Sequence, residues 1–411
     1  MKRVVITGFG ALSPLGHDWP TVEARLRSRR NAVQVMAEWE DYEGLFTKVG
    51  APVAPFELPP EGYNRKSTRS MGKVALMATR ASEIALTDAG LLNDPILKSG
   101  KVGISYGSSS GTPKAIGDFG RMIHEKSTEG INATTYIKMM SHTAAVNMGV
   151  FFGISGRIVP TSSACTSGSQ GIGYAYEMIQ SGKQVIMLAG GAEELDATQA
   201  AVFDTLFATS VHHNATPHLT PRPFDAQRDG LVLGEGACTL ILEELEHAQA
   251  RGATIYAEIL GYGTNSDGRH VTHPQPETMA IAIELALAEA GLAPTDIAYV
   301  NAHGTATVQG DEAESRATQS VFGERIPISS LKSYMGHTLG ACGALEAWIS
   351  IQMMRSAWFA PTLNLDALDP RCHELDYITG DGRNIDTDIV MSNNFAFGGI
   401  NTSLIFRRWP S

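Results

Sequence analysis

Short apolar runs rich in β-branched residues alternate along the chain with longer segments that repeat alanine and other apolar residues at helical spacing. Val4–Gly10 is one such run and ends in a glycine turn, and Val185–Ala192 is another. Strands that are apolar throughout, rather than at every second position, are buried on both faces, so helices must cover both faces of their sheet. The pattern therefore predicts an α/β fold without a linker between separate modules.

An internal repeat relates the two parts of the chain. Residues 85–91 (ALTDAGL) align with residues 286–292 (ALAEAGL), an offset of 286 − 85 = 201 positions. Each copy ends a predicted helix at a glycine, and each is followed by a strand, 102–107 in the first copy and 297–300 in the second. Each strand runs into a small polar loop, so the chain is expected to be a duplicated α/β unit.

The duplication extends to two strands that end near reactive side chains. A strand at 158–159 leads to Cys165 and then to a helix, and a strand at 326–330 leads to His337 and then to a helix. Loops at strand ends carry a large share of catalytic residues because a rigid scaffold holds them in place. We expect the chemistry to lie where the two halves meet.

Composition narrows the class of protein. Hydrophobic residues make up 43% and charged residues 18% of 411, which argues against disorder and coiled coil. The formal net charge of −11 argues against a nucleic acid or an anionic membrane as the main partner. No apolar run approaches the roughly 20 residues of a membrane span, and a cytoplasmic protein is expected. The four cysteines lack metal or redox spacing, so free thiols and no metal site are expected.

Cys165 is the candidate nucleophile. Small polar residues flank it on both sides, and helical spacing of apolar residues follows from Ile172 onward. At the start of a helix, unpaired N–H groups and the helix dipole favour the thiolate, which attacks carbonyl carbon. The other cysteines, Cys238, Cys342 and Cys372, are expected to be buried structural residues.

Two histidines are candidates for stabilising negative charge. His303 stands in the segment NAHGT and His337 in KSYMGHTLG, each after a predicted strand and beside a glycine. Neutral imidazoles directed at one carbonyl oxygen donate hydrogen bonds to the charge that builds on an enolate or a tetrahedral adduct. Other histidines, such as His142 and His218, are expected to be ordinary core or surface residues.

Four motifs, in order along the chain, resemble the β-ketoacyl-[acyl carrier protein] synthases of the elongating type. They are SACTSG around Cys165, NAHGT around His303, KS and GHTLG around His337, and NFAFGGIN at 394–401. The segment RPFDAQRDG, followed by GEGA, is similar to a further signature of that family. The resemblance covers essentially the whole chain.

The resemblance implies a fold, a reaction and partners. The fold is the thiolase fold, an α/β architecture in which two αβαβα halves, 1–250 and 251–411, form a five-layered sandwich. The reaction moves an acyl chain from an acyl carrier protein to Cys165 and condenses it with malonyl carrier protein, giving a 3-oxoacyl product and CO2. A homodimer, or a heterodimer with a related ketosynthase-like subunit, is implied. No cofactor is implied, because the carrier's phosphopantetheine holds the substrates.

The resemblance also implies roles for individual residues. Cys165 is the nucleophile, and the N–H groups of Cys165 and Phe397 form the oxyanion hole. His303 and His337 hold the malonyl thioester carbonyl. The remaining residues support or position these groups: Lys332 and Glu346 form a buried supporting pair, Phe397 is also the gate, and Phe395, Thr272, Thr305 and Thr307 contact the pantetheine arm.

Three features depart from the family's pattern. Asn394 stands where the family usually has serine, Ala396 stands where it usually has glycine, and residues 107–113 (GSSSGTP) are unusually rich in serine. Alanine excludes most of the φ > 0 region, so a stiffer gate is expected. Together these departures make a specialised polyene or polyketide-like chain an alternative to a saturated fatty acyl chain.

A local basic cluster, Arg65, Lys66, Arg69 and Lys73, contrasts with the acidic total. Carrier proteins are acidic, and the cluster is similar to the family's carrier-docking region. It is therefore expected to hold the carrier through contacts that weaken with salt. A solvated helix face would carry the same charges without a partner.

Other classes of protein account for less of the sequence. A serine hydrolase finds G-x-S-x-G at 103–107 and 107–111, but Pro113 follows where a helix should begin, and the Cys165 motif stays unexplained. A dinucleotide-binding motif at 8–13 (GFGALS) has serine in place of its third glycine. A ketosynthase subunit that acts only with a chain-length-factor partner stays open as an alternative.

Overall fold

The computed structural model describes residues 1–410. Ten of the eleven strands of its main sheet form two runs of five that meet at their first strands. The N-terminal run consists of β1 (Val4–Leu12), β8 (Gly236–Glu244), β6 (Ile186–Glu193), β4 (Val102–Gly107) and β5 (Ile158–Thr161). The C-terminal run consists of β9 (Ala257–Ser266), β16 (Ile400–Arg408), β15 (Ile389–Phe395), β10 (Val300–Asn301) and β11 (Pro327–Ser329), with β13 (Asp376–Tyr377) added at its edge.

The two runs share one pattern of strand directions. In the N-terminal run, β1–β8 and β8–β6 are antiparallel, whereas β6–β4 and β4–β5 are parallel. In the C-terminal run, β9–β16 and β16–β15 are antiparallel, whereas β15–β10 and β10–β11 are parallel. A short antiparallel contact between β1 and β9 joins them into one sheet. The predicted duplication is confirmed.

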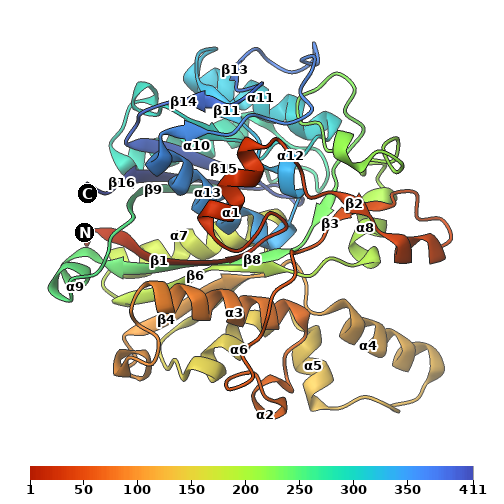
Figure 1. Cartoon of the computed structure of the whole chain (residues 1–411), viewed down its shortest axis with the longest axis vertical. Helices are drawn as coiled ribbons and strands as arrows, with labels where there is room; N and C mark the ends of the chain where they lie inside the picture. The colour runs from red at the N-terminus through yellow and green to blue at the C-terminus, as the bar shows by residue number, and fades with distance from the viewer. Residues whose placement is uncertain (411) are drawn as a thin grey trace.

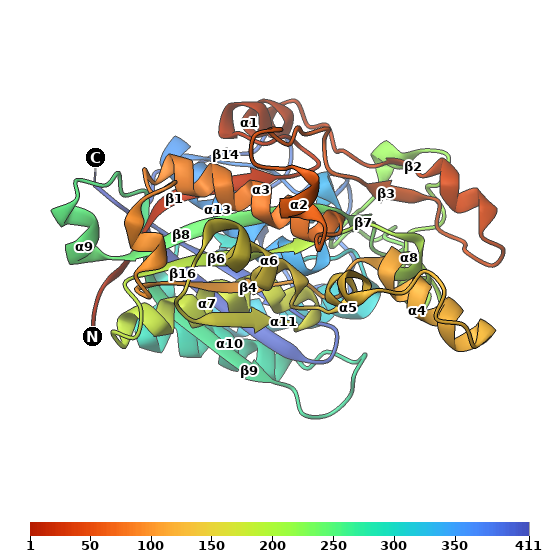
Figure 2. The same ribbon diagram turned by 90° about the horizontal axis from the view of Figure 1, so that it is seen from below.

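Helices form three layers around the two sheet halves (Figure 1). One outer layer packs on the N-terminal strands, the central layer lies between the halves, and the other outer layer packs on the C-terminal strands. Figure 2 shows the first outer layer in front of the N-terminal strands. In this order the layers are α3 (Lys73–Asp88) with α6 (Thr143–Phe152), α7 (Ser167–Gln180) with α13 (Cys342–Ser356), and α10 (Pro276–Ala290) with α11 (Val308–Phe322). Three helical and two sheet layers make the predicted five-layered α/β sandwich.

Smaller elements surround the five-layered sandwich. The remaining α-helices are α1 (Trp19–Arg27), α2 (Arg65–Thr68), α4 (Pro113–Glu125), α5 (Ala133–Met139), α8 (Ala197–Asp204), α9 (Leu245–Ala250) and α12 (Lys332–Met335). Two small sheets join β2 (Gln34–Val35), β3 (Val49–Ala51) and β7 (Leu233–Gly234), and β12 (Trp358–Phe359) with β14 (Arg383–Asn384). Within residues 1–410, no helix combines the length and the apolar character that crossing a membrane requires.

Glycines in equivalent strands explain why the repeated helices pack so closely. A Cβ on Gly10 of β1 would lie 2.0 Å from the Ala81 carbonyl oxygen of α3, and a Cβ on Gly263 of β9 would lie 2.0 Å from the Ala282 carbonyl oxygen of α10. The absence of a side chain therefore lets each helix lie directly on its strand. The glycines at the N-terminus thus serve helix–strand packing, as their counterparts in β9 do.

Two details differ from the sequence-based expectations. The strand expected at 297–300 is shorter than predicted: β10 is confined to Val300–Asn301 and follows a 3-10 turn at residues 294–296. The expectation that Pro113 breaks a helix is wrong: α4 begins there, at the first helical position, where proline's missing N–H costs nothing. Ser105 of the first G-x-S-x-G lies inside β4 and is fully buried, which removes it as a hydrolase nucleophile.

Candidate active site

Cys165 lies between a strand of the N-terminal half and the central helix layer. After β5 the chain enters the one-turn 3-10 helix η3 (Ala164–Thr166), which continues directly into α7. Ala164 has φ +50, a left-handed conformation that few non-glycine residues adopt and that is over-represented at functional sites. The sharp turn brings Cys165 to the start of α7, as the sequence predicts, and the residue is only 3% exposed.

Some groups around Cys165 raise the pKa of its thiol and others lower it. Burial raises the pKa of Cys165 above its ordinary value, whereas the Phe397 backbone N–H, the Lys332 ammonium and its own backbone N–H lower that pKa. Burial has the largest effect, so the start of the helix does not give a preformed thiolate. The backbone N–H groups of Phe397 and Cys165 both act on the sulfur, so two donors lie beside the atom that would carry an acyl group.

Both candidate histidines face Cys165 from the C-terminal half. The Cys165 sulfur and one ring nitrogen each of His303 and His337 lie within 4.8 Å of one another. The two imidazole rings are nearly perpendicular, at 88°, with centroids 5.1 Å apart. Both residues are buried, and His303 Nδ1 and both ring nitrogens of His337 have no hydrogen-bond partner among residues 1–410. Buried, unpartnered ring nitrogens are costly unless a ligand group meets them.

The charge state of these imidazoles follows from burial and from one cation. Burial, followed by the nearby Lys332 ammonium, lowers the pKa of His303 and of His337 well below the ordinary histidine value. Both rings are therefore neutral at physiological pH. A neutral ring carries one N–H donor, which suits it to bind a carbonyl or enolate oxygen.

Lys332 and Glu346 form a fully buried ion pair behind the histidines. Lys332 opens α12, and its ammonium contacts Glu346 Oε1 of α13. Burial alone would lower the pKa of Lys332, but the adjacent Glu346 carboxylate raises it overall, so the ammonium persists. Asn394 of β15 donates from Nδ2 to Glu346 Oε2 at 2.6 Å. The asparagine that departs from the family's usual serine thus supplies a direct hydrogen bond to the pair.

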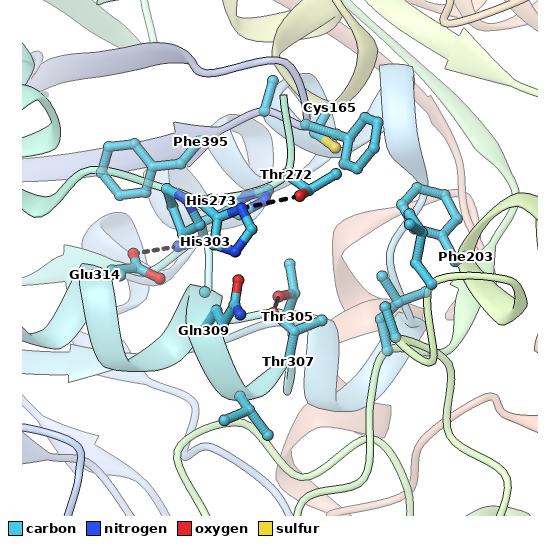
Figure 3. Close-up of a pocket in the computed structure, with 18 of the residues that line it drawn as sticks. Cys165, Phe203, Thr272, His273, His303, Thr305, Thr307, Gln309, Glu314 and Phe395 are labelled. Carbon is cyan, nitrogen blue, oxygen red and sulfur yellow. Dashed lines mark hydrogen bonds between the residues drawn. The ribbon is translucent and has the colours of Figure 1, made fainter. Parts of the chain in front are cut away.

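Sequence reasoning missed Glu314, a buried residue of α11. Its carboxyl accepts a backbone N–H bond from His303 at 2.7 Å (Figure 3) and another from Gly304 at 2.6 Å. Burial is the main cause that raises the pKa of Glu314 to about 8. The carboxyl thereby fixes the backbone of the His303 loop. The only signal in the sequence is the spacing of Asp311 and Glu314, which places two acidic residues on the buried side of one helix.

A cavity of about 480 Å³ leads to Cys165 and the two histidines. Thr272, Thr305 and Thr307 line it, and the Thr305 and Thr307 hydroxyls lie 2.9 Å apart. Figure 3 shows Cys165 at the cavity, with His303 on one side and Phe203 on the other. The predicted site residues Phe395 and Phe397 line the same space.

The segment after β15 borders this cavity. The rings of Phe397 and Phe203 meet edge to face at a centroid distance of 6.0 Å. Gly398 and Gly399 have φ +97 and +76, and the Gly398 N–H donates to the Val271 carbonyl, which joins this loop to the one after β9. The left-handed positions thus fall after Phe397, and Ala396 does not occupy one.

The basic cluster lies apart from the cavity. Arg65 and Lys66 are on α2, Arg69 follows it, and all three are exposed and absent from the cavity lining. Lys73 instead pairs with Glu235 at 2.6 Å. The cluster that remains for a partner is therefore Arg65, Lys66 and Arg69.

The donor set of the site also bears on metal binding. A cysteine sulfur and two imidazole nitrogens are ligands that Zn²⁺ accepts. The Lys332 ammonium lies near enough to both histidines to lower their pKa values, and the same positive charge opposes a bound cation. The geometry suits a polarised carbonyl oxygen better than a metal ion.

Comparison with known proteins agrees with this geometry. The family described as Beta-ketoacyl synthase, N-terminal domain matches residues 1–248, and Beta-ketoacyl synthase, C-terminal domain matches residues 256–366. The chain belongs to the β-ketoacyl synthase family. It is a condensing enzyme of the acyltransferase class.

Individual relatives match over their full lengths. The 3-oxoacyl-[acyl-carrier-protein] synthase 1 of Haemophilus influenzae is 37% identical, with 100% of both chains covered. A crystal structure of a β-ketoacyl synthase from Burkholderia phymatum is 60% identical, with a TM-score of 0.98 and 100% of both chains covered. A type II polyketide ketosynthase, seen in complex with its acyl-carrier protein and bound to a hexaketide, is 29% identical, with a TM-score of 0.88 and the same coverage.

Proposed function

We propose that Cys165 carries the growing acyl chain. The Cys165 thiol attacks the carbonyl carbon of an acyl thioester on a carrier protein, its proton passes to the departing sulfur, and the carrier leaves as a thiol. Malonyl carrier protein then loses CO2, and the electrons of the broken C–C bond form an enolate whose oxygen accepts hydrogen bonds from His303 and His337. The enolate carbon attacks the Cys165 thioester, its C–S bond breaks, and a 3-oxoacyl carrier two carbons longer is released.

One observation carries this proposal: a buried sulfur and two neutral, unpartnered imidazoles converge within 4.8 Å at a cavity. The thioester needs the sulfur, and the enolate oxygen needs the imidazole donors. Lys332 and Glu346 orient these rings and keep them neutral. Phe397 gates the cavity, and its backbone N–H completes the oxyanion hole. Thr272, Thr305, Thr307 and Phe395 contact the pantetheine arm.

The experiment is peptide mass spectrometry after incubation with a panel of saturated and polyunsaturated acyl-carrier thioesters. Acylation of Cys165 is expected, and the preferred chain distinguishes primary fatty-acid synthesis from a specialised polyene or polyketide-type pathway. Acylation of Ser109 in place of Cys165 would overturn the proposal in favour of a hydrolase. Absence of acylation with every chain, reversed by adding a related subunit, would identify a ketosynthase that needs a chain-length-factor partner.

The carrier protein is proposed to approach through Arg65, Lys66 and Arg69. These exposed cations contrast with the net charge of −11, and an acidic carrier is attracted to them. The KM for acyl-carrier substrate should rise with ionic strength, because exposed charges are screened beyond about 8 Å at physiological salt. A triple alanine variant should lose this salt dependence.

We further propose that the protein pairs with a second chain along β5. Among residues 1–410, β5 pairs with β4 on one side and with no strand on the other, and Ile158 of β5 and Val150 of α6 are exposed. An unpaired edge strand beside exposed apolar residues is a ready surface for association. Light scattering distinguishes a homodimer from a monomer that awaits a related subunit.

A cytoplasmic location is proposed from the four free, buried cysteines.

A further inference from the structure

Two imidazoles and a hydroxyl lie together on the loop that follows β9, where they line the active-site cavity. The Nδ1 atoms of His270 and His273 are 2.7 Å apart. The Thr272 hydroxyl oxygen lies 3.1 Å from the first of these nitrogens and 3.2 Å from the second. Figure 3 shows Thr272 and His273 of this group, which we call the histidine cluster. Both rings are exposed, so an ion in solution reaches them directly.

The two rings are arranged more like ligands of one ion than like partners in a linear hydrogen bond. Two imidazoles joined by a linear N–H···N bond of 2.7 Å would have ring centroids about 5 Å apart. Two imidazoles with nitrogens this close, each bound to one ion at about 2.0–2.1 Å, would have centroids about 4.2 Å apart. The centroids of His270 and His273 are 4.3 Å apart. The Thr272 backbone N–H donates to His270 Nδ1 at 3.1 Å, so the lone pair of that nitrogen faces the cluster.

The charges around the histidine cluster favour a cation. Among the residues that the structure describes, no lysine or arginine lines the cavity, whereas Asp229 and Asp267 do. Arg269 is adjacent in sequence, but its guanidinium donates to Gln275 Oε1 at 3.3 Å. The deeper site differs, because the Lys332 ammonium opposes a cation there.

We propose that His270, Thr272 and His273 bind a divalent transition-metal ion that closes the mouth of the cavity. The two nitrogens subtend an angle of about 80–85° at such an ion, which suits Cu²⁺ or Ni²⁺ better than tetrahedral Zn²⁺. Water completes the coordination. The Gly398 N–H donates to the Val271 carbonyl, so an ion that fixes this loop also restrains the loop after β15.

The ion and the substrate compete for the same space. Under the proposed function Thr272 contacts the pantetheine arm, and here its hydroxyl is a metal ligand. The bound ion and its waters also stand in the cavity through which Cys165 is reached. Reversible inhibition by the metal is therefore expected. Only this consequence rests on the proposed function, whereas metal binding by the cluster does not.

The first test is isothermal titration calorimetry of the full chain with NiCl₂, and with ZnCl₂ as a second probe. Ni²⁺ is expected to bind more tightly than Zn²⁺. Loss of an outer contact to a metal ligand alone costs about 10–100-fold in affinity, so His273→Ala, which removes a ligand, should weaken Ni²⁺ binding by about 100-fold or more. Equal Ni²⁺ affinity in this variant and the wild type, or no heat of binding with either metal at millimolar concentration, would overturn the proposal.

Two further variants serve as controls for the location of the site. His213→Ala is the matched control, because His213 Nδ1 lies 3.3 Å from the Thr216 hydroxyl but contacts no second imidazole among residues 1–410. It should leave the Ni²⁺ affinity unchanged. Cys165→Ala should also leave it unchanged, and weaker binding in that variant would place the ion at the deeper site instead.

The second test measures the consequence for catalysis. Acylation of Cys165 by an acyl-carrier thioester is followed by mass spectrometry with and without Ni²⁺. The metal should slow the wild type, a chelator should restore it, and His273→Ala should be insensitive. Inhibition that persists in His273→Ala would overturn closure of the cavity by this ion. If Cys165 is not acylated even without metal, the proposed function fails, while the calorimetry still decides the metal site.

Discussion

The two halves of the molecule use the same strand-to-helix connection for different purposes. In the N-terminal half, residues 162–163 join β5 to η3 and α7; in the C-terminal half, residues 330–338 join β11 to the one-turn helix η6 (Leu339–Ala341) and α13. Each one-turn helix begins at a residue with positive φ, +50 at Ala164 and +43 at Leu339. Cys165 and Gly340 are therefore structural equivalents, one with a thiol and the other without a side chain.

The difference shows how a duplicated frame comes to hold one site rather than two. The Gly340 and Ser109 N–H groups both donate to Glu193 Oε2, at 2.9 Å each. A Cβ on Gly340 would lie 2.8 Å from that oxygen. The buried Glu193 carboxyl thus fills the space beside Gly340 that corresponds to the nucleophile pocket around Cys165. The longer C-terminal connection instead supplies Lys332 and His337 to the nucleophile of the other half.

The strongest test of this asymmetry is Cys165→Ala, which makes the two connections alike. We expect formation of 3-oxoacyl product to fall by about 10⁴-fold or more, because no other group supplies the covalent step. The fold should persist, since the side chain shrinks without a new charge. Product is measured by mass spectrometry and folding by thermal denaturation. Full activity in this variant would contradict the role of Cys165.

His303→Ala tests whether the C-terminal half contributes chemistry rather than support. CO2 release from malonyl carrier protein should fall by about 10³-fold, because one of two donors to the enolate oxygen is lost. Acylation of Cys165 should change only a few-fold, which separates the two half-reactions. The measurement is release of labelled CO2, and an unchanged rate would remove His303 from this role.

A smaller effect is expected from Asn394→Ala, which removes the hydrogen bond to Glu346. The carboxylate then loses a buried donor, a change of about 1.5–3 kcal/mol for a charged acceptor, and condensation should slow about tenfold. Asn394→Ser should recover part of the rate because it retains a donor. The pH profile of condensation is the diagnostic measurement, and a profile and rate equal to those of the wild type would exclude a positioning role.

The smallest effect on turnover is expected from Glu193→Gln. Glu193 fills the space beside Gly340 that corresponds to the nucleophile pocket around Cys165. Burial is the main cause that raises the pKa of Glu193 to about 7. The unfolded chain releases this proton near its ordinary pKa of 4.5, so the stability from a neutral Glu193 is present below that pH and lost as pH rises to about 7.

The measured quantity is the free energy of unfolding of both proteins between about pH 5 and pH 8. The variant should gain stability relative to the wild type across this window, up to about 3 kcal/mol. Glutamine also loses hydrogen bonds that the carboxyl accepts, and this loss changes the free energy of unfolding by the same amount at every pH. The pH dependence of the difference between variant and wild type is therefore the informative result. Parallel pH profiles would show that the carboxyl does not titrate in this window.

The repeat, the buried strands and the three reacting residues could be predicted from the sequence because each has a local signal. The helix ends at Gly90 and Gly291 both carry positive φ, as the two copies of the repeat predict. Cys165, His303 and His337 each follow a strand, and loops at strand ends carry a large share of catalytic residues.

The remaining features depend on how separate elements of the fold pack against one another. Glu314 meets His303 through the packing of α11, and Asn394 meets Glu346 across the central layer, so neither bond has a local signature. The pKa of Cys165 is set mainly by burial, whereas the sequence indicates only the start of a helix.

The depth of Cys165 has a consequence for covalent labelling. The thiol lies at a cavity of about 480 Å³, and the other three cysteines are buried in the core. Reagent shape rather than intrinsic reactivity therefore governs modification: a slender haloacetamide on a linear stem enters, whereas a maleimide attached directly to a bulky dye is excluded. A stem that mimics the pantetheine arm would turn the enzyme into a singly tagged protein without removal of any cysteine.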